Sequence, residues 1–276
     1  MANKIDEKLA ELRSAKRKGL MTHVVVGYPS LEATAELVTA MADEGVDFVE
    51  LQIPFSDPLA DGPTIQSACE LSLARGTKVR DAFLVAARLT KSVDIPLLFM
   101  AYFNTVYKYG VVRFCKDAQG AGIAGLIIPD IPLEAARHEG FLKACKANGL
   151  HNIITLAPTS TRERLVKNAA VATGFAYCMS REGVTGAQSG PGSDLPAYLT
   201  GVAAEMPVPL AVGFGISNRE RLKAVLPYCD IAVVGSALVE TIANAPDGEA
   251  ATRVAGFLRE LIPVLDDYGD GTGIHR

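Results

Sequence analysis

The sequence predicts a single (β/α)8 barrel preceded by an extra N-terminal helix. Short apolar runs rich in β-forming residues recur eight times, and a longer stretch with helical periodicity separates each run from the next. No Pro-, Ser- or Gly-rich linker divides the chain before its tail. Eight strands that alternate with helices have the closed parallel barrel as their usual arrangement.

The predicted strands are mostly continuous apolar runs, which is typical of strands that are buried on both faces. They are Met21–Val26, Phe48–Ile53, Pro96–Tyr102, Ala124–Pro129, Asn152–Leu156, Gly174–Met179, Pro209–Gly213 and Ile231–Gly235.

The predicted helices carry apolar residues at helical spacing, and several end at a glycine (Gly45, Gly120, Gly149), where a helix stop needs a left-handed residue. They are Ile5–Lys18, Leu31–Glu44, Val79–Lys91, Val112–Gln119, Leu133–Asn148, Arg162–Val171, Leu195–Ala204, Arg219–Leu226 and Glu249–Leu265.

An open doubly wound sheet is the alternative arrangement of such elements. The dinucleotide fingerprint typical of that fold does not follow the first strand, where the residues are Val26-Gly27-Tyr28-Pro29-Ser30. We therefore expect residues 1–276 to form one barrel domain, with the extra helix within residues 1–20 and a flexible tail over 266–276.

Composition limits the partners and the compartment. The formal net charge of −4 argues against general binding to nucleic acid or to an anionic membrane, although it leaves room for a local phosphate site. No uncharged run reaches the 18 residues of a membrane helix, and the charged N-terminal segment does not resemble a signal peptide. The five cysteines are widely spaced, which favours a reduced cytoplasmic protein.

The second predicted strand carries a carboxylate, Glu50, in an apolar run. A buried carboxylate is costly unless it is paired or used in chemistry. Alternation places Glu50 on one face with Phe48 and Gln52, and if that face points inward, Glu50 lies at the C-terminal end of the barrel, where active sites of this fold are found. A structural carboxylate that caps the strand is the alternative.

The following loop, residues 54–64, contains three prolines and a glycine and is therefore stiff. It holds Asp57 and Asp61. Asp61 precedes Gly-Pro-Thr and a helix-like run, so a turn or capping role is the alternative to a catalytic one. Two carboxylates that meet in one pocket can divide acid and base roles.

Glycine turns follow the seventh and eighth strands, at Gly213-Phe214-Gly215 and at Gly235-Ser236. Glycine lets backbone N–H groups approach a ligand, and a following helix directs its positive end to the same point. Because these two loops form the recurrent phosphate site of barrel enzymes, the sequence predicts a phosphate site here.

The loop after the sixth strand, Ser180–Gly192, contains four glycines and is either a mobile lid or a long surface loop.

The four histidines show no metal-ligand spacing, no lysine lies in a predicted strand, and no G-x-S-x-G motif occurs. We therefore expect neither a metal nor a cofactor.

The run Glu50-Leu51-Gln52-Ile53-Pro54-Phe55-Ser56-Asp57-Pro58-Leu59-Ala60-Asp61-Gly62-Pro63-Thr64-Ile65-Gln66 strongly resembles the signature of the tryptophan synthase alpha subunit family. The segments at 27–30, 102–104, 180–186 and 213–217 resemble the family in the same order, over nearly the whole chain. The resemblance implies a lyase of tryptophan biosynthesis that cleaves indole-3-glycerol phosphate to indole and glyceraldehyde 3-phosphate. It also implies a beta subunit as partner, in an α2β2 heterotetramer.

The resemblance further implies the roles of individual residues. Glu50 would be the general acid and base, and Asp61 would accept a hydrogen bond from the indole N–H. The phosphate would contact Gly186, Gly213, Phe214, Gly215, Gly235 and Ser236, the indole would lie against Ile65, Tyr102, Tyr177 and Phe214, and Thr185 of the lid would reach the loop that bears Asp61.

Three positions depart from the family pattern. Gln52 stands where glycine is usual, His23 stands where an apolar or aromatic residue is usual, and Pro129 lies where members vary. Two other functions remain: an indole-releasing lyase that works without a partner, and an impaired alpha-like chain that mainly activates its partner. Another phosphate-handling barrel isomerase or synthase is disfavoured by the Glu50 and Asp61 motif.

Overall fold

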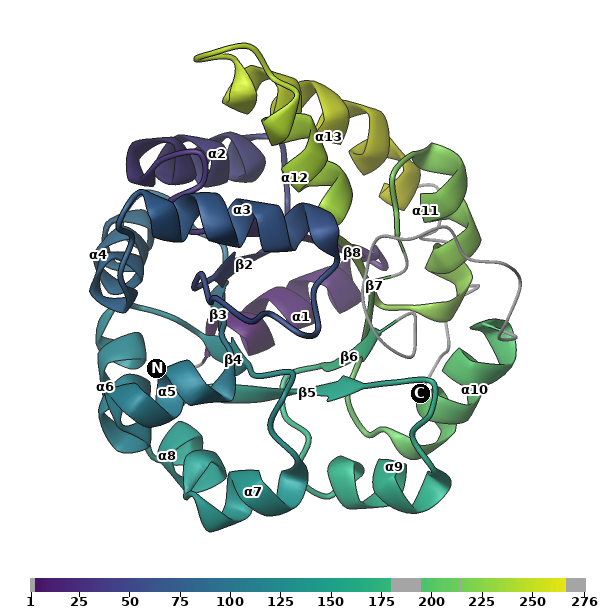
Figure 1. The fold of residues 1–276 in the computed structure, drawn as a ribbon. Helices are drawn as coiled ribbons and strands as arrows, with labels where there is room; N and C mark the ends of the chain where they lie inside the picture. Colours follow the sequence, from purple (N-terminus) through teal and green to yellow (C-terminus); the bar gives the residue numbers. More distant parts are fainter. Residues whose placement is uncertain (1–2, 180–194, 214, 267–276) are drawn as a thin grey trace.

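A computed structural model describes residues 3–179, 195–213 and 215–266 and shows the predicted closed barrel (Figure 1). Each strand pairs in parallel with the next, and the eighth pairs with the first. The strands are β1 (Gly19–Val25), β2 (Phe48–Gln52), β3 (Leu97–Met100), β4 (Gly125–Ile127), β5 (His151–Leu156), β6 (Ala176–Met179), β7 (Leu210–Gly213) and β8 (Ile231–Val234).

Helices form a ring outside the strands, apart from α1, which lies across the middle of the ring in the view of Figure 1. The helices are α1 (Lys4–Ser14), α2 (Leu31–Asp43), α3 (Pro63–Ala74), α4 (Val79–Leu89), α5 (Phe103–Tyr109), α6 (Val111–Gly120), α7 (Leu133–His138), α8 (Phe141–Ala147), α9 (Arg162–Ala169), α10 (Leu195–Glu205), α11 (Arg219–Val225), α12 (Ser236–Ala243) and α13 (Ala250–Asp266), with a 3-10 turn at Leu226–Tyr228. None of the described helices has the length and apolar character needed to cross a membrane.

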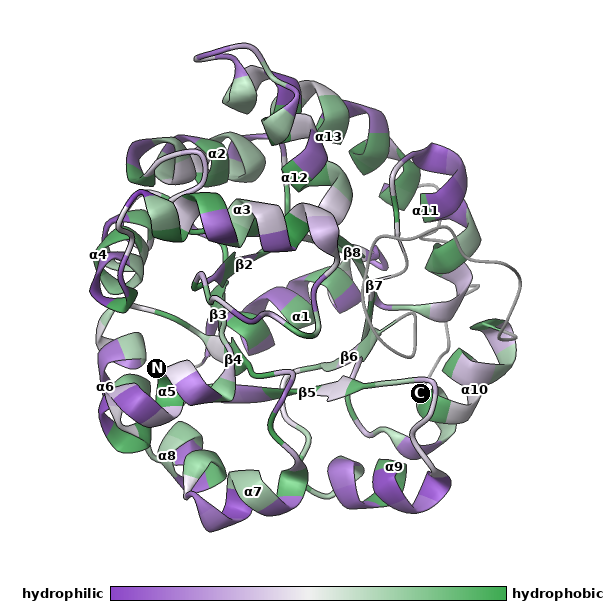
Figure 2. Cartoon of the chain, viewed as in Figure 1, coloured by the Kyte–Doolittle hydropathy of each residue, from purple (hydrophilic) through white to green (hydrophobic). Residues whose placement is uncertain are grey.

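The strands separate the two larger parts of the apolar core. One set of side chains fills the barrel interior and includes Met21, Phe48, Leu98 and Phe175. The larger set lies between the strands and the surrounding helices and includes Val49. Figure 2 accordingly shows apolar strands and polar outer helix surfaces. Phe48 points inward and Val49 outward, so the predicted alternation of this strand is confirmed.

The extra N-terminal helix closes the amino-terminal end of the barrel. Its Ile5 and Leu12 are buried among the interior side chains. A Cβ added at Gly19, at the start of β1, would lie 2.9 Å from Leu12 Cδ1, and one at Gly125 would lie 2.9 Å from Ile5 Cδ1. Glycine at both strand starts therefore makes room for α1, and the opposite end of the barrel is left for the site.

Some predicted helix boundaries were wrong. The stretch Leu133–Asn148 is two helices, α7 and α8, because Gly140 between them has a left-handed φ of 72°. The N-terminal helix stops at Ser14, before Lys16, whose φ is 51°. After α6 the left-handed glycine is Gly122 rather than Gly120.

Leu12→Ala should lower the free energy of unfolding by about 2–5 kcal/mol, because it leaves a cavity between α1 and the barrel interior. Leu84→Ala is the matched control, since Leu84 on α4 is 68% exposed, and it should change stability by less than about 0.5 kcal/mol. Urea denaturation of both variants measures the difference. Equal effects would mean that α1 does not contribute to the core.

Candidate active site

The register between β1 and β2 brings His23 and Glu50 together. His23 lies directly opposite Glu50 in this parallel pair, and Gln52 is the last residue of β2. All three side chains are buried, with His23 2%, Glu50 3% and Gln52 0% exposed. They share the inward face with Met21 and Phe48, two residues earlier on each strand. The barrel mouth therefore carries three polar groups from two neighbouring strands.

His23 Nδ1 and Glu50 Oε1 are 2.6 Å apart and form a hydrogen bond. Burial alone would lower the pKa of His23, but attraction to Glu50, the hydrogen bond to it and attraction to Asp61 outweigh burial and raise that pKa. The raised pKa keeps His23 charged to a higher pH than a free histidine. Glu50 Oε2 is buried and has no hydrogen-bond partner among the described residues.

Asp61 reaches the same place from the loop after β2 and is 5% exposed. Gln52 donates from Nε2 to Asp61 Oδ2 over 2.7 Å, and the Tyr102 hydroxyl donates to the same oxygen over 2.8 Å. Burial raises the pKa of Asp61; nearby His23 and these two hydrogen bonds oppose that rise without cancelling it. Asp61 therefore takes up a proton more readily than an exposed aspartate.

Tyr102 fixes the loop that carries Asp61. It follows β3, is 1% exposed and stacks on Phe55, with ring centroids 5.3 Å apart. Its hydroxyl oxygen also accepts a hydrogen bond of 3.0 Å from the Ala60 backbone N–H. One side chain thus holds both the backbone and the carboxylate of this loop.

Tyr177 of β6 faces the two carboxylates from the far side of the barrel. Burial, with the negative charges of Glu50 and Asp61, raises the pKa of its hydroxyl well above the usual value. A Cβ added at Gly213 would lie 3.0 Å from the Tyr177 ring and hydroxyl. Glycine at the end of β7 therefore leaves the space that Tyr177 occupies.

The turn after β8 opens onto the same mouth. Gly235 and Ser236 begin α12, and a Cβ at Gly235 would lie 3.8 Å from His23 Cβ and 4.0 Å from Ile65 Cδ1, which are ordinary contact distances. Ile65, on α3, is 5% exposed. The first turn of α12 therefore lies next to the polar cluster, with its positive end available to an anion.

The structure places most of the predicted site residues at this mouth. Glu50, Asp61, Tyr102 and Tyr177 lie together, with Ile65, Gly213, Gly235 and Ser236 around them. Gly215 is exposed, with a φ of 61°, and its nearest neighbour is Arg221 of α11, whose Nη1 is 3.7 Å from the position of an added Cβ. Phe214, Thr185, Gly186 and the rest of the predicted lid lie outside the described residues.

From the sequence, His23 and Gln52 were departures from the family pattern and were not predicted as site residues. Asp57, considered beside Asp61, is exposed and accepts its hydrogen bond from Ser56. Within the described ranges, no three His, Cys, Asp or Glu side chains are arranged to hold a metal ion.

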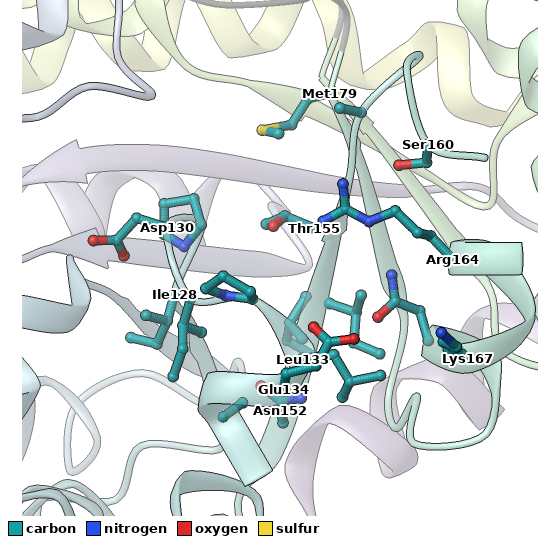
Figure 3. Close-up of a pocket in the computed structure, with 18 of the residues that line it drawn as sticks. Ile128, Asp130, Leu133, Glu134, Asn152, Thr155, Ser160, Arg164, Lys167 and Met179 are labelled. Carbon is teal, nitrogen blue, oxygen red and sulfur yellow. The ribbon is translucent and has the colours of Figure 1, made fainter. Parts of the chain in front are cut away.

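A separate hollow of about 230 Å³ lies at the carboxyl ends of β4 and β5 (Figure 3). Figure 3 shows Arg164 extending into it from α9, with Thr155 beside it and Glu134 below. Neither Glu50 nor Asp61 lines this hollow, which belongs to the outer rim of the barrel.

Comparison with known proteins identifies the family. The family model of the tryptophan synthase alpha chain matches residues 9–260. The tryptophan synthase alpha chain of Desulfotalea psychrophila is 45% identical over 257 residues, which cover 93% of this chain and 99% of that relative. This chain belongs to the tryptophan synthase alpha chain family. The alpha chain of Dehalococcoides mccartyi is 43% identical over 251 residues, 91% of this chain and 96% of that one.

Solved structures of the family have the same fold. The tryptophan synthase alpha subunit of Legionella pneumophila superposes with a TM-score of 0.89 at 31% identity, over 97% of this chain and 100% of that one. A chain of Mycobacterium tuberculosis tryptophan synthase superposes with a TM-score of 0.87 at 33% identity, over 96% and 99% of the two chains. The barrel described above is therefore the fold of the tryptophan synthase alpha chain.

Tyr102→Phe should move the loss of activity at acid pH to a higher pH. The variant keeps the ring that stacks on Phe55 but removes a hydrogen bond that favours ionised Asp61, so the raised pKa of Asp61 rises further. A hydrogen bond to a charged group contributes about 1.5–3 kcal/mol, equivalent to about one to two pH units. The pH profile of kcat/KM for indole release measures the shift.

The matched control for this variant is Tyr109→Phe, which also removes a hydroxyl that donates to a carboxylate, that of Asp117, over 2.6 Å. This pair joins α5 and α6, and the control should keep the wild-type profile. Identical profiles for all three proteins would show that the Tyr102 hydroxyl does not act on an ionised Asp61 during catalysis.

Proposed function

We propose that this chain performs the reaction of its family, the cleavage of indole-3-glycerol phosphate to indole and glyceraldehyde 3-phosphate, with Glu50 and Asp61 as its catalytic residues. One observation carries the assignment of residues: two buried carboxylates meet at the barrel mouth, and each is held by its own set of partners. Different surroundings are what two carboxylates need in order to take different roles.

Glu50 is suited to move protons. Its neutral form would protonate C3 of the indole, which makes the ring an electron acceptor. The carboxylate would then take the proton of the glycerol hydroxyl nearest the ring. As the aldehyde C=O forms, the carbon–carbon bond breaks and its electron pair returns to the ring. Glu50 ends with the proton count it had at the start. Its buried Oε2, which has no partner among the described residues, is the oxygen free for this task.

Asp61 is suited to stabilise the positive charge that appears on the ring after protonation. A carboxylate accepts a hydrogen bond from the indole N–H and attracts the cation. The described side chains that donate to Asp61 both bind Oδ2, so Oδ1 is the oxygen proposed for the indole. Tyr102, Tyr177 and Ile65 supply apolar surface for the ring.

The phosphate is proposed to bind where the turns after β7 and β8 meet the mouth, at Gly213, Phe214, Gly215, Gly235 and Ser236, with Gly186 from the following loop. The first turn of α12 supports this, because a helix N-terminus attracts anions through its N–H groups and dipole. Arg221, beside Gly215, adds a nearby positive charge that the sequence had not indicated.

A beta subunit is the partner proposed for this chain, in an α2β2 assembly. Apolar groups are exposed on the rim that would face it: Leu59, in the loop after β2, is 80% exposed, and Tyr107 of α5 is 56% exposed. The comparisons favour this function over a lyase without a partner or an impaired activating chain. The five cysteines are free thiols, which supports a reducing compartment such as the cytoplasm.

Glu50→Gln should lower indole release from indole-3-glycerol phosphate by a factor of about 10²–10⁴, because an amide cannot shuttle the proton. Asp57→Asn is the matched control, since it also neutralises a carboxylate near the mouth but at an exposed position. Steady-state kinetics and circular dichroism separate loss of chemistry from loss of fold. Wild-type turnover by Glu50→Gln would contradict the assignment.

Gly235→Asp should weaken binding of the phosphate group steeply, because it places a carboxylate next to a dianion. Gly235→Ala is the control for the added Cβ, which has ordinary contact distances to His23 and Ile65 and should fit. Calorimetry with indole-propanol phosphate should therefore give an affinity near wild type for the alanine variant and a much lower one for the aspartate variant. Equal affinities for both would place the phosphate elsewhere.

A further inference from the structure

The mouth of the barrel contains polar groups that the proposed reaction does not itself require. His23 and Gln52 touch the two catalytic carboxylates, one each, and neither is needed as acid, base or phosphate ligand. Both side chains are buried, and burying a histidine and an amide costs free energy unless hydrogen bonds or charges compensate for the lost water. Their arrangement therefore calls for an explanation.

The direction of each hydrogen bond follows from its partner. An ionised carboxylate only accepts, so the Gln52 amide must turn its NH2 group to Asp61 and its oxygen, Oε1, the other way. Likewise His23 must carry its proton on Nδ1 to donate to Glu50 Oε1. The two carboxylates thus set the orientation of both side chains.

Two atoms are left over, and they are complementary. His23 Nε2 and Gln52 Oε1 are both buried and have no hydrogen-bond partner among the described residues. A protonated Nε2 is a donor and Oε1 is an acceptor. Gln52 is also close enough to His23 to contribute to raising the pKa of the histidine.

We propose that His23 and Gln52 are positioning residues that form one polar bridge between Glu50 and Asp61, with His23 positively charged in the resting site. The bridge runs from Glu50 Oε1 through both nitrogens of His23 to Gln52 and on to Asp61 Oδ2. It holds one oxygen of each carboxylate and leaves Glu50 Oε2 and Asp61 Oδ1 for the substrate. In this resting state Glu50 and Asp61 are both ionised, and the positive charge lies between two negative charges that would otherwise repel each other in a buried site. Before the reaction begins, Glu50 takes up from solvent, on Oε2, the proton that it gives to the indole.

The charge of His23 depends on few groups. The groups that act on it are Glu50 and Gln52 of β2 and Asp61 of the following loop. On the β8 side the neighbour of His23 is Gly235, and Ile65 lies beside Gly235. Neither residue carries a charge. Tyr102 donates a hydrogen bond to Asp61, and Tyr177 faces both carboxylates. Burial and the negative charge of the carboxylates raise the pKa of both hydroxyls, so both tyrosines stay neutral.

The test rests on the proposed lyase activity and begins with the wild-type chain, whose failure to release indole would overturn that function itself. In an active background, His23→Phe should lower kcat at least tenfold with KM within about threefold of wild type, because the substrate contacts remain but Glu50 loses its fixed orientation. His23→Asn places an amide donor near the position of Nδ1 but carries no charge and has no second nitrogen for Gln52, so it should recover only part of kcat. A wild-type kcat for His23→Phe, or full recovery with His23→Asn, would overturn the proposal.

A double mutant tests the bridge itself. Gln52→Gly should also lower kcat. The double mutant His23→Phe/Gln52→Gly should have a kcat no lower than that of the less active single mutant, because removing either residue already breaks the bridge. If the fold-losses in kcat of the two single mutants instead multiply in the double mutant, the two residues act independently and the bridge is contradicted. Thermal melting of every variant separates these results from a general loss of stability.

The charge of His23 has a readout that does not need activity. Imidazole ¹⁵N resonances of the wild-type protein, assigned by their absence in His23→Phe, should show both ring nitrogens protonated at pH 7, above the ordinary histidine pKa of 6.5. A neutral ring at that pH would contradict the charged bridge.

Discussion

Because eight parallel strands close into a ring, all their carboxyl ends meet at one rim, and the interior has room only for side chains. One end of this interior is filled by α1, whose Ile5 and Leu12 lie against glycines at the starts of β4 and β1. The other end is therefore the one place where polar side chains from different strands can converge while remaining shielded from water. Every feature of the candidate site depends on this closure.

The register of β1 against β2 then decides which side chains meet. His23 and Glu50 are direct neighbours in that register, so a hydrogen bond between them needs no unusual backbone. Burying two carboxylates is unfavourable, and the raised pKa of Asp61 records that cost. Hydrogen bonds from Gln52 and Tyr102 and the charge of His23 offset it in part. The same contacts that make the burial tolerable also orient the carboxylates, which links the stability of the mouth to its chemistry.

Much of this could be read from the sequence, because it depends on local pattern. The eight apolar runs, the shared face of Phe48, Glu50 and Gln52 and the polar loop that bears Asp61 follow from alternation and composition, whereas the structure was needed to show that this face points inward. Helix α5 was not predicted, because its seven residues hold only two turns of periodic pattern and follow a predicted strand without a break. The break at Gly140 was also missed, because a glycine inside a helical pattern becomes a stop only when its φ turns positive. The contacts of His23 and Gln52 depend on strand register and on a loop folding back, which no single segment encodes.

The most direct measurement is a crystal structure of this chain with indole-propanol phosphate. We expect the indole N–H within hydrogen-bond distance of Asp61, Glu50 Oε2 facing C3 of the ring, and the phosphate on the turns after β7 and β8. We also expect the hydrogen bond between His23 and Glu50 to persist in the complex. An indole ring bound away from the two carboxylates, or a phosphate bound at another part of the rim, would contradict the site described for this barrel.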